Sequence, residues 1–189
     1  MLKLNLGCGN KKKEDFINVD CVHEVAPDVV LKLDQVGTRW PWEDGSVDEV
    51  LMCHSLEHMG QTTEAFFHVI KELYRVCANG AKVRVIVPHE RSSGFTGDPT
   101  HVRIINIPVM SLFSKEECRK SREKGFPNTP LAEYINVDFR MYKQEYSLFP
   151  GWHQRLQKGE ITEEELYAAI DTYFNVVCEV DMEFLVVKE

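Results

Sequence analysis

The residues best suited to proton transfer are two histidines in the middle of the chain, His89 and His101. A neutral imidazole can take a proton from a hydroxyl or an amine near physiological pH, and a carboxylate beside it can orient the ring. Glu90 and Asp98 are the carboxylates that lie close to these histidines in the sequence. We therefore expect His89, His101 and Asp98 to be catalytic residues.

Two other interpretations of these residues stay open. Asp98-Pro99 is also a typical N-cap and first residue of a helix, in which case Asp98 only starts a helix. Imidazole and carboxylate are ordinary metal ligands, but the spacing of His89, Asp98 and His101 matches no metal-binding motif. No metal site is therefore expected.

A glycine turn, Gly7-Cys8-Gly9, ends the first apolar run and can face a ligand with its backbone N–H groups, because glycine has no Cβ. Asp20 ends the next apolar run and can accept hydrogen bonds from two ribose hydroxyls. The dinucleotide fingerprint needs a third glycine three residues after the second, where this chain has Lys12. Asp20 also follows Gly7 by 13 residues, against about 20 in that fingerprint. An NAD-dependent oxidoreductase is therefore disfavoured.

The first half of the chain resembles the class I S-adenosylmethionine-dependent methyltransferases. The resemblance rests on residues 4–10 (LNLGCGN), 33–34 (LD), 40–50 (WPWEDGSVDEV), 54–58 (HSLEH) and the helix leading to Arg75-Val76. It implies that the glycine turn faces the methionine part of the cofactor, that Asp20 holds the ribose, and that Asp34 with Gln35 lies by the adenine. The cofactor-binding residues that it implies are Asn5, Gly7, Cys8, Gly9, Asn10, Asp20, Leu33, Asp34, Gln35, His54, Ser55 and His58.

The resemblance implies an enzyme that transfers a methyl group from S-adenosylmethionine to oxygen or nitrogen of a small molecule or a sugar-containing intermediate. The net charge of −8 argues against a surface for nucleic-acid phosphates, so a nucleic-acid partner is not expected. Asn5 departs from the resemblance, because many relatives have an acidic residue there that helps to hold the cofactor's ammonium group. This departure leaves open a non-catalytic protein that binds S-adenosylmethionine or serves a partner.

A parallel α/β sheet is expected to position these residues at the carboxyl ends of its strands. Apolar runs predict strands at 3–6, 16–20, 29–33, 49–53 and 82–87, and residues 66–77 have helical spacing closed by Asn79-Gly80. Only a turn or two of helix fits between Gly9 and Asp20, so the first crossover is abbreviated. We expect a Rossmann-like, doubly wound, mostly parallel sheet of about seven strands.

The second half of the chain is expected to cover the site and to complete the sheet. Residues 88–136 and 147–162 predict insertion or loop segments over the acceptor site, and capping boxes at Ser114/Glu117 and Thr162/Glu165 predict two helices. The runs 137–146 and 176–187 predict a final antiparallel pair of strands. An exposed final strand can pair two subunits into a homodimer.

Length and composition predict one domain that spans residues 1–189. The chain is 43% hydrophobic, and a typical domain holds roughly 100–200 residues. The cysteines are widely spaced, with no Cys-x-x-Cys pair, which is typical of reduced thiols. No apolar run approaches the roughly 20 residues that cross a membrane, so we expect a cytoplasmic protein without a membrane partner.

Overall fold

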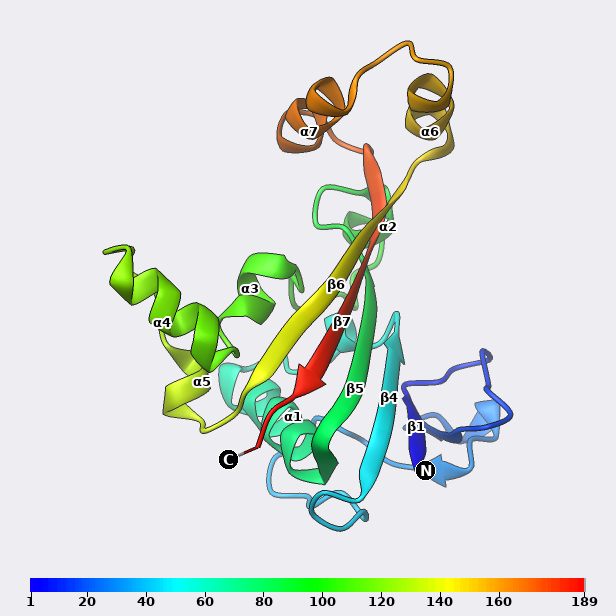
Figure 1. Cartoon of the computed structure of the whole chain (residues 1–189). Coiled ribbons are helices and arrows are strands. Elements are labelled where there is room, and N and C mark those ends of the chain that lie inside the picture. The colour runs from blue at the N-terminus through cyan, green and yellow to red at the C-terminus, as the bar shows by residue number, and fades with distance from the viewer. Residues whose placement is uncertain (189) are drawn as a thin grey trace.

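The computed structural model describes residues 1–188, which form one seven-stranded sheet (Figure 1). The strands are β1 (Lys3–Leu6), β2 (Ile17–Asp20), β3 (Val29–Val30), β4 (Val47–Cys53), β5 (Cys77–Pro88), β6 (Phe139–Leu148) and β7 (Val177–Val186). Their order in the sheet is β3-β2-β1-β4-β5-β7-β6. The first five strands are parallel, and β7 runs antiparallel to both β5 and β6. The predicted Rossmann-like, mostly parallel sheet is confirmed.

Nine helical elements connect these strands in the described chain. They are η1 (His23–Val25), η2 (Leu56–His58), α1 (Thr63–Val76), α2 (Ser93–Thr96), α3 (Ile107–Ser111), α4 (Lys115–Glu123), α5 (Leu131–Tyr134), α6 (Pro150–Gln157) and α7 (Glu163–Thr172). The longest, α1, begins where the Thr62 side chain accepts a hydrogen bond from the Ala65 N–H. Its apolar side chains recur every three or four residues and are buried against the sheet.

One face of the sheet carries the core. Leu4, Val50, Val83 and Phe184 are register neighbours across four strands, and each is at most 1% exposed. They pack in one cluster with Phe66 and the other buried side chains of α1. This burial is the main stabilising contribution to the fold, because each fully buried large apolar side chain adds about 1.5–3 kcal/mol.

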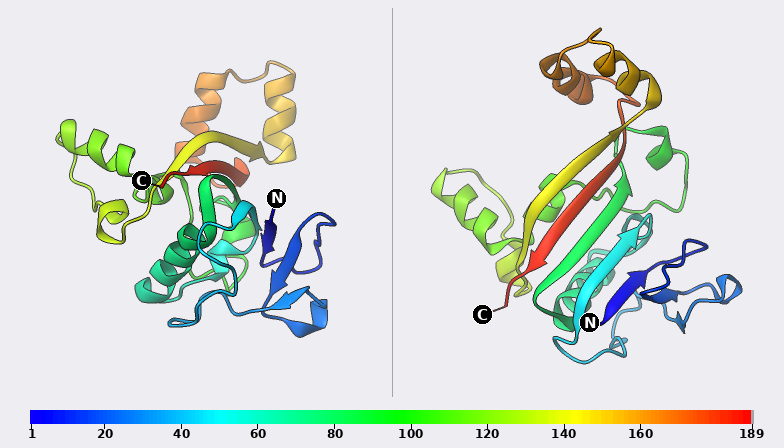
Figure 2. Two further views of the ribbon diagram at one scale, coloured as in Figure 1. Left: turned by 60° about the horizontal axis from the view of Figure 1, so that its bottom comes forward. Right: turned by 45° about the vertical axis from the view of Figure 1, so that its right-hand side comes forward.

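The opposite face of the sheet has no helix over it among residues 1–188. In the right-hand view of Figure 2, strands β6, β7, β5 and β4 show this face uncovered. Ion pairs lie across it, including Lys3–Glu49 at 2.9 Å and Arg84–Asp181 at 2.5 Å. The strands accordingly alternate buried and more exposed residues, which is typical of a sheet with one solvated face. This face is left uncovered because residues 7–16 contain no helix and only the short η1 lies between β2 and β3.

Several expectations differ from the structure: β4 begins at Val47 rather than at residue 49, and β5 begins at Cys77 rather than at residue 82. β3 ends at Val30 rather than at residue 33. α1 ends at Val76, before the expected Asn79-Gly80 closure, because Cys77 is already extended and pairs with Val47 of β4. The final strand, β7, was expected at an exposed edge, but it lies between β5 and β6, so the edge strand at that end of the sheet is β6.

None of the helices within residues 1–188 is both long enough and apolar enough to cross a membrane.

Candidate functional site

A cavity of about 400 Å³ opens at the carboxyl ends of β1, β2 and β4. This volume falls within the range of small-molecule sites, and ligands of open α/β sheets bind at this end of the strands. Of the residues expected to bind the cofactor, those lining the cavity are Gly7, Gly9, Asp20, Leu33, Asp34, His54, Ser55 and His58. Cys21, Leu31, Lys32 and Met59 complete the wall.

The glycine turn is held against β2 and η2 at close range. Gly7 has φ +71°, and a Cβ on it would lie 2.3 Å from Cβ of Ser55. Its N–H donates to the carbonyl of Val19 at 2.8 Å. The Gly9 N–H donates to Oδ2 of Asp20 at 2.8 Å. Only glycine fits at position 7, and the Asp20 carboxylate fixes the turn while each of its oxygens keeps a lone pair for a ligand.

Four of the expected cofactor residues do not line the cavity. Asn5 is 2% exposed, and its amide donates to the Lys11 carbonyl at 3.0 Å and to Oδ1 of Asn18 at 2.9 Å. Asn5 therefore positions the loop that follows the glycine turn. The other three are Cys8, which is buried, and Asn10 and Gln35, which are exposed.

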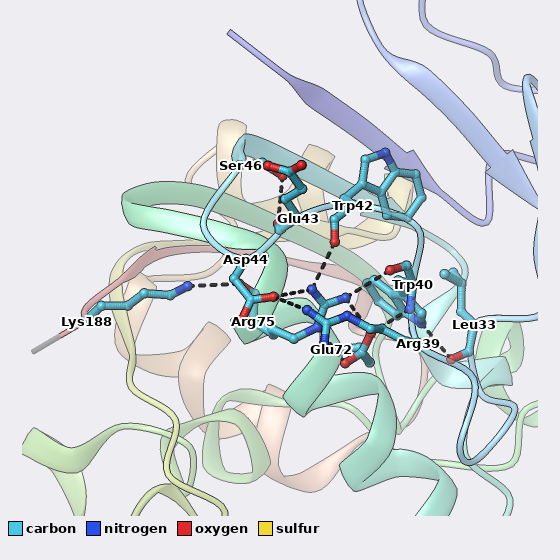
Figure 3. A network of polar contacts seen from close by, with 10 residues as sticks. All are labelled: Leu33, Arg39, Trp40, Trp42, Glu43, Asp44, Ser46, Glu72, Arg75 and Lys188. Atoms are coloured by element: carbon cyan, nitrogen blue, oxygen red, sulfur yellow. Dashed lines mark hydrogen bonds and ion pairs between the residues drawn. The ribbon is translucent and has the colours of Figure 1, made fainter.

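A network of polar contacts holds the segment that carries Leu33 and Asp34 (Figure 3). The Trp40 indole N–H donates to the Leu33 carbonyl at 3.2 Å. Arg75 of α1 in turn donates to the Trp40 carbonyl at 3.0 Å, and pairs with Glu72 at 2.7 Å and Asp44 at 2.6 Å. The Glu72 carboxylate raises the pKa of the Arg75 guanidinium. These contacts fix the Leu33–Asp34 side of the cavity from behind.

His54 lies between this cavity and a second one. Its backbone is left-handed, with φ +53°, which is uncommon for a residue with a side chain. Its Nε2 lies 2.8 Å from Oε1 of Glu179, and its Nδ1 lies 3.6 Å from Oε1 of Glu57. The contact with Glu57 and then the charge of Glu179 raise the pKa of His54.

The second cavity, of about 480 Å³, shares His54 and His58 with the first. It contains the expected catalytic residues Asp98 and His101, together with Pro88, Ser93, Gly94, Phe149, Cys178 and Glu179. From the expected insertion segments, five residues between 88 and 101 and Phe149 contribute to its wall, whereas α4 and α5 do not line it.

Asp98 starts no helix, so that interpretation of Asp98-Pro99 is wrong. Its Oδ1 accepts hydrogen bonds from the N–H of Thr100 at 2.8 Å and from the Thr100 hydroxyl at 2.6 Å, and the next helix begins only at Ile107. The hydrogen bonds from Thr100 lower the pKa of Asp98. Asp98 closes a turn that presents His101.

The structure does not bring His89 together with Asp98 and His101. His89 lines a different cavity of about 330 Å³, where its ring lies 6.0 Å from that of Tyr146. Its Nδ1 accepts a hydrogen bond from the Arg91 N–H at 3.1 Å. Burial lowers the pKa of His89.

Two residues near the site were not among those expected from the sequence. Glu57 lies directly before His58 in the 54–58 segment, and this position between two site histidines is a signal that could have identified it. Glu179 has no such signal, because it comes from β7, 125 positions after the His54 that it contacts.

Comparison with known proteins yields structural matches only. No family model matches the chain, and no curated protein matches it. A SAM-dependent methyltransferase from Archaeoglobus fulgidus is 15% identical, with a TM-score of 0.59 over 97% of this chain and 85% of that chain.

Two further solved structures show how varied such neighbours are. The [4+2]-cyclase SpnF is 13% identical, with a TM-score of 0.56 over 99% of this chain and 75% of that one. The 1,6-didemethyltoxoflavin-N1-methyltransferase of Burkholderia thailandensis, solved with S-adenosylhomocysteine, is 10% identical, with a TM-score of 0.51 over 99% and 71%. With its strand order and its cavity at the glycine turn, the chain has the Rossmann-like fold of the class I S-adenosylmethionine-dependent methyltransferases.

Proposed function

We propose that the chain binds S-adenosylmethionine in the cavity at the glycine turn and uses it as a methyl donor. The observation that carries this proposal is the Gly7–Asp20 arrangement: a turn that only glycine can make, tied to a carboxylate that faces the same cavity. The cavity also lies where the strand order of the sheet reverses, beyond the ends of β1 and β4.

The second cavity is the proposed acceptor site, for an oxygen or nitrogen of a small molecule or a sugar-containing intermediate. Methyl transfer from a sulfonium is an in-line displacement, so alignment of the two reactants supplies much of the rate. A site that shares His54 and His58 with the donor cavity can provide that alignment. Asp98 and His101 border it, whereas the separate cavity of His89 gives that residue no contact with either reactant.

Calorimetric titration tests the cofactor. We expect binding of S-adenosylmethionine and of S-adenosylhomocysteine, and an affinity at least several-fold lower in Asp20→Ala. Asp28→Ala is the matched control, because Asp28 bonds Asn18 of the same strand but does not line the cavity. Heat with NAD and none with either sulfur ligand would refute the proposal.

A non-catalytic binding protein is the second candidate, and Asn5 favours it. Asn5 is buried beneath the turn and puts no carboxylate into the cavity for the cofactor's ammonium group. Formation of S-adenosylhomocysteine in the presence of a panel of hydroxyl and amine acceptors distinguishes the two candidates. Tight cofactor binding with no turnover on any acceptor supports the non-catalytic function.

A homodimer remains part of the proposal, with β6 in place of β7 as the pairing strand. β6 is ten residues long and lies at the edge of the sheet, where no strand within residues 1–188 pairs with its outer backbone groups. Light scattering that gives twice the chain mass of 21.8 kDa would support this dimer, and the monomer mass would exclude it.

A further inference from the structure

Three side chains meet at the boundary between the two cavities: Glu57 and His58 of η2, and His101 of the loop after α2. One ligand atom from each lies within 4.8 Å of the others. The two imidazole rings lie 4.6 Å apart between centroids. Two metal bonds of about 2.1 Å span at most about 4.2 Å, so small side-chain rotations bring all three onto one ion.

Glu57 is the observation that points to a bound cation. The residue is 0% exposed, and neither of its carboxylate oxygens has a hydrogen-bond partner among the described residues. The nearest positive group is His54, whose Nδ1 lies 3.6 Å from Oε1. A buried carboxylate without hydrogen bonds is costly, and buried charges are normally paired or coordinate a metal.

The two histidines are already oriented as metal ligands. His101 Nδ1 lies 2.8 Å from the Phe95 carbonyl, which can only accept, so Nδ1 carries the proton and Nε2 keeps its lone pair. His58 Nδ1 lies 2.9 Å from the Thr100 hydroxyl oxygen, whose own proton goes to Asp98.

His58 therefore also donates from Nδ1 and keeps the lone pair of Nε2. Metal-bound histidines usually donate their other N–H to a carbonyl or to a carboxylate-linked group in this way.

The loop that carries His101 is fastened to η2. The N–H groups of Val102 and Arg103 donate to the Glu57 backbone carbonyl at 3.0 and 3.2 Å. The Arg103 guanidinium donates to the Gly60 carbonyl at 2.8 Å and lies 4.3 Å from the centroid of the Phe66 ring. The ligands, which lie up to 44 positions apart in the sequence, are thus held by contacts that do not require an ion.

We propose that Glu57, His58 and His101 bind one divalent transition-metal ion, and that this ion holds a hydroxyl oxygen of the acceptor. Two imidazoles and one carboxylate suit Zn²⁺ or a similar ion, and three protein ligands leave a coordination position open for an oxygen. The second half of this proposal rests on the proposed function. The binding of the ion itself does not.

The ion would make the acceptor nucleophilic by lowering the pKa of the bound hydroxyl. The hydroxyl loses its proton to solvent water. The oxygen then forms a bond to the methyl carbon, the bond from that carbon to sulfur breaks, and its electron pair stays on the sulfur of S-adenosylhomocysteine. His101 accordingly acts as a ligand, and no oxidant or reductant is needed.

Titration of the metal-free full chain with Co²⁺, followed by visible absorbance, and with Zn²⁺, followed by calorimetry, tests the site. We expect one ion per chain, and an affinity about 100-fold lower in His58→Ala and in His101→Ala. His153→Ala, at an exposed position on α6, is the control and should bind like the wild type. Unchanged affinity in both site variants overturns the proposal.

Glu57→Gln gives a second readout that does not depend on activity. In EDTA this variant should melt at or above the wild-type temperature, because it removes a buried charge that lacks hydrogen bonds. Added Zn²⁺ should raise the melting temperature of the wild type and leave that of Glu57→Gln unchanged. An equal rise in both proteins overturns the assignment of Glu57.

The role in transfer is tested separately from the cofactor. EDTA should leave the affinity for S-adenosylhomocysteine within about twofold of its value with metal, while turnover on hydroxyl acceptors is lost and returns with Zn²⁺. Metal binding without cofactor binding refutes the proposed function and leaves the metal site standing. Cofactor binding without metal binding refutes the metal site and leaves the proposed function standing.

Discussion

Gly7→Ala tests whether position 7 of the glycine turn requires glycine because a Cβ there would be strained and would clash with Ser55. An alanine at φ +71° costs about 1–2 kcal/mol, because its Cβ approaches the following carbonyl oxygen. The new Cβ would also lie 2.3 Å from Cβ of Ser55, which adds about 1–3 kcal/mol of overpacking. We expect urea denaturation to show a total loss of about 2–5 kcal/mol in the free energy of unfolding, and calorimetry to show weaker S-adenosylhomocysteine binding.

Gly9→Ala is the matched control. Gly9 also has a positive φ, +47°, but a Cβ on it meets nothing within 4 Å, so only the backbone cost of about 1–2 kcal/mol applies. The double variant Gly7→Ala/Ser55→Gly removes the atom that clashes and should show a favourable coupling of about 1–3 kcal/mol. Equal losses for the two alanine variants, or purely additive losses in the double variant, would refute the reasoning.

Two further predictions concern buried charge and pH. Arg75→Met should lower the free energy of unfolding by about 3 kcal/mol in urea denaturation, because it strands the Glu72 carboxylate, whereas Arg119→Met removes only an exposed pair and should cost less than about 1 kcal/mol. His89 has a pKa lowered by burial, so the unfolded chain binds its proton first and stability should fall as pH drops below about 6.5, by at most about 1.4 kcal/mol per pH unit. In thermal melts, the melting temperature of His89→Phe should fall less over that pH range than that of the wild type. The exposed-site variant His153→Phe should follow the wild type. Parallel curves for all three proteins would contradict the contribution of His89 to the pH dependence.

The strands and the long helix were predictable because their signals are local. The runs that form β1 and β4 are apolar and short, and the spacing of Phe66, Val69 and Leu73 specifies one buried face of α1. The boundary at Cys77 was not predictable, because pairing with Val47 decides it and that contact is non-local.

Two sequence features indicate the uncovered sheet face, and only the first of them was used to predict the fold. The short path from Gly9 to Asp20 predicted an abbreviated crossover, and the structure shows turns with no helix there. The alternation of charged and apolar residues along β7, with Asp181 and Glu183 between buried neighbours, indicates the same solvated face.

The cofactor side of the site was more predictable than the acceptor side. Gly7 and Asp20 reach their cavity through short strands whose ends must coincide in a parallel sheet. His89 and His101 are close in sequence, but the chain leaves β5 through a turn and α2, which separates their side chains into different cavities. The buried, unpartnered carboxylate of Glu57 depends on packing that no spacing rule describes.

The place of β7 in the sheet sets the order in which a growing chain can finish folding. Among the seven described strands, β7 comes last in the chain, yet it lies between β5 and β6 and pairs with both. Until it emerges from the ribosome, β6 has no neighbour in the sheet, and the apolar face that ends at Val83 and Val85 lacks its partners Phe184 and Met182. The nascent protein therefore exposes an unpaired strand edge until β7 has left the ribosome, and an unpaired edge of this kind is prone to aggregation.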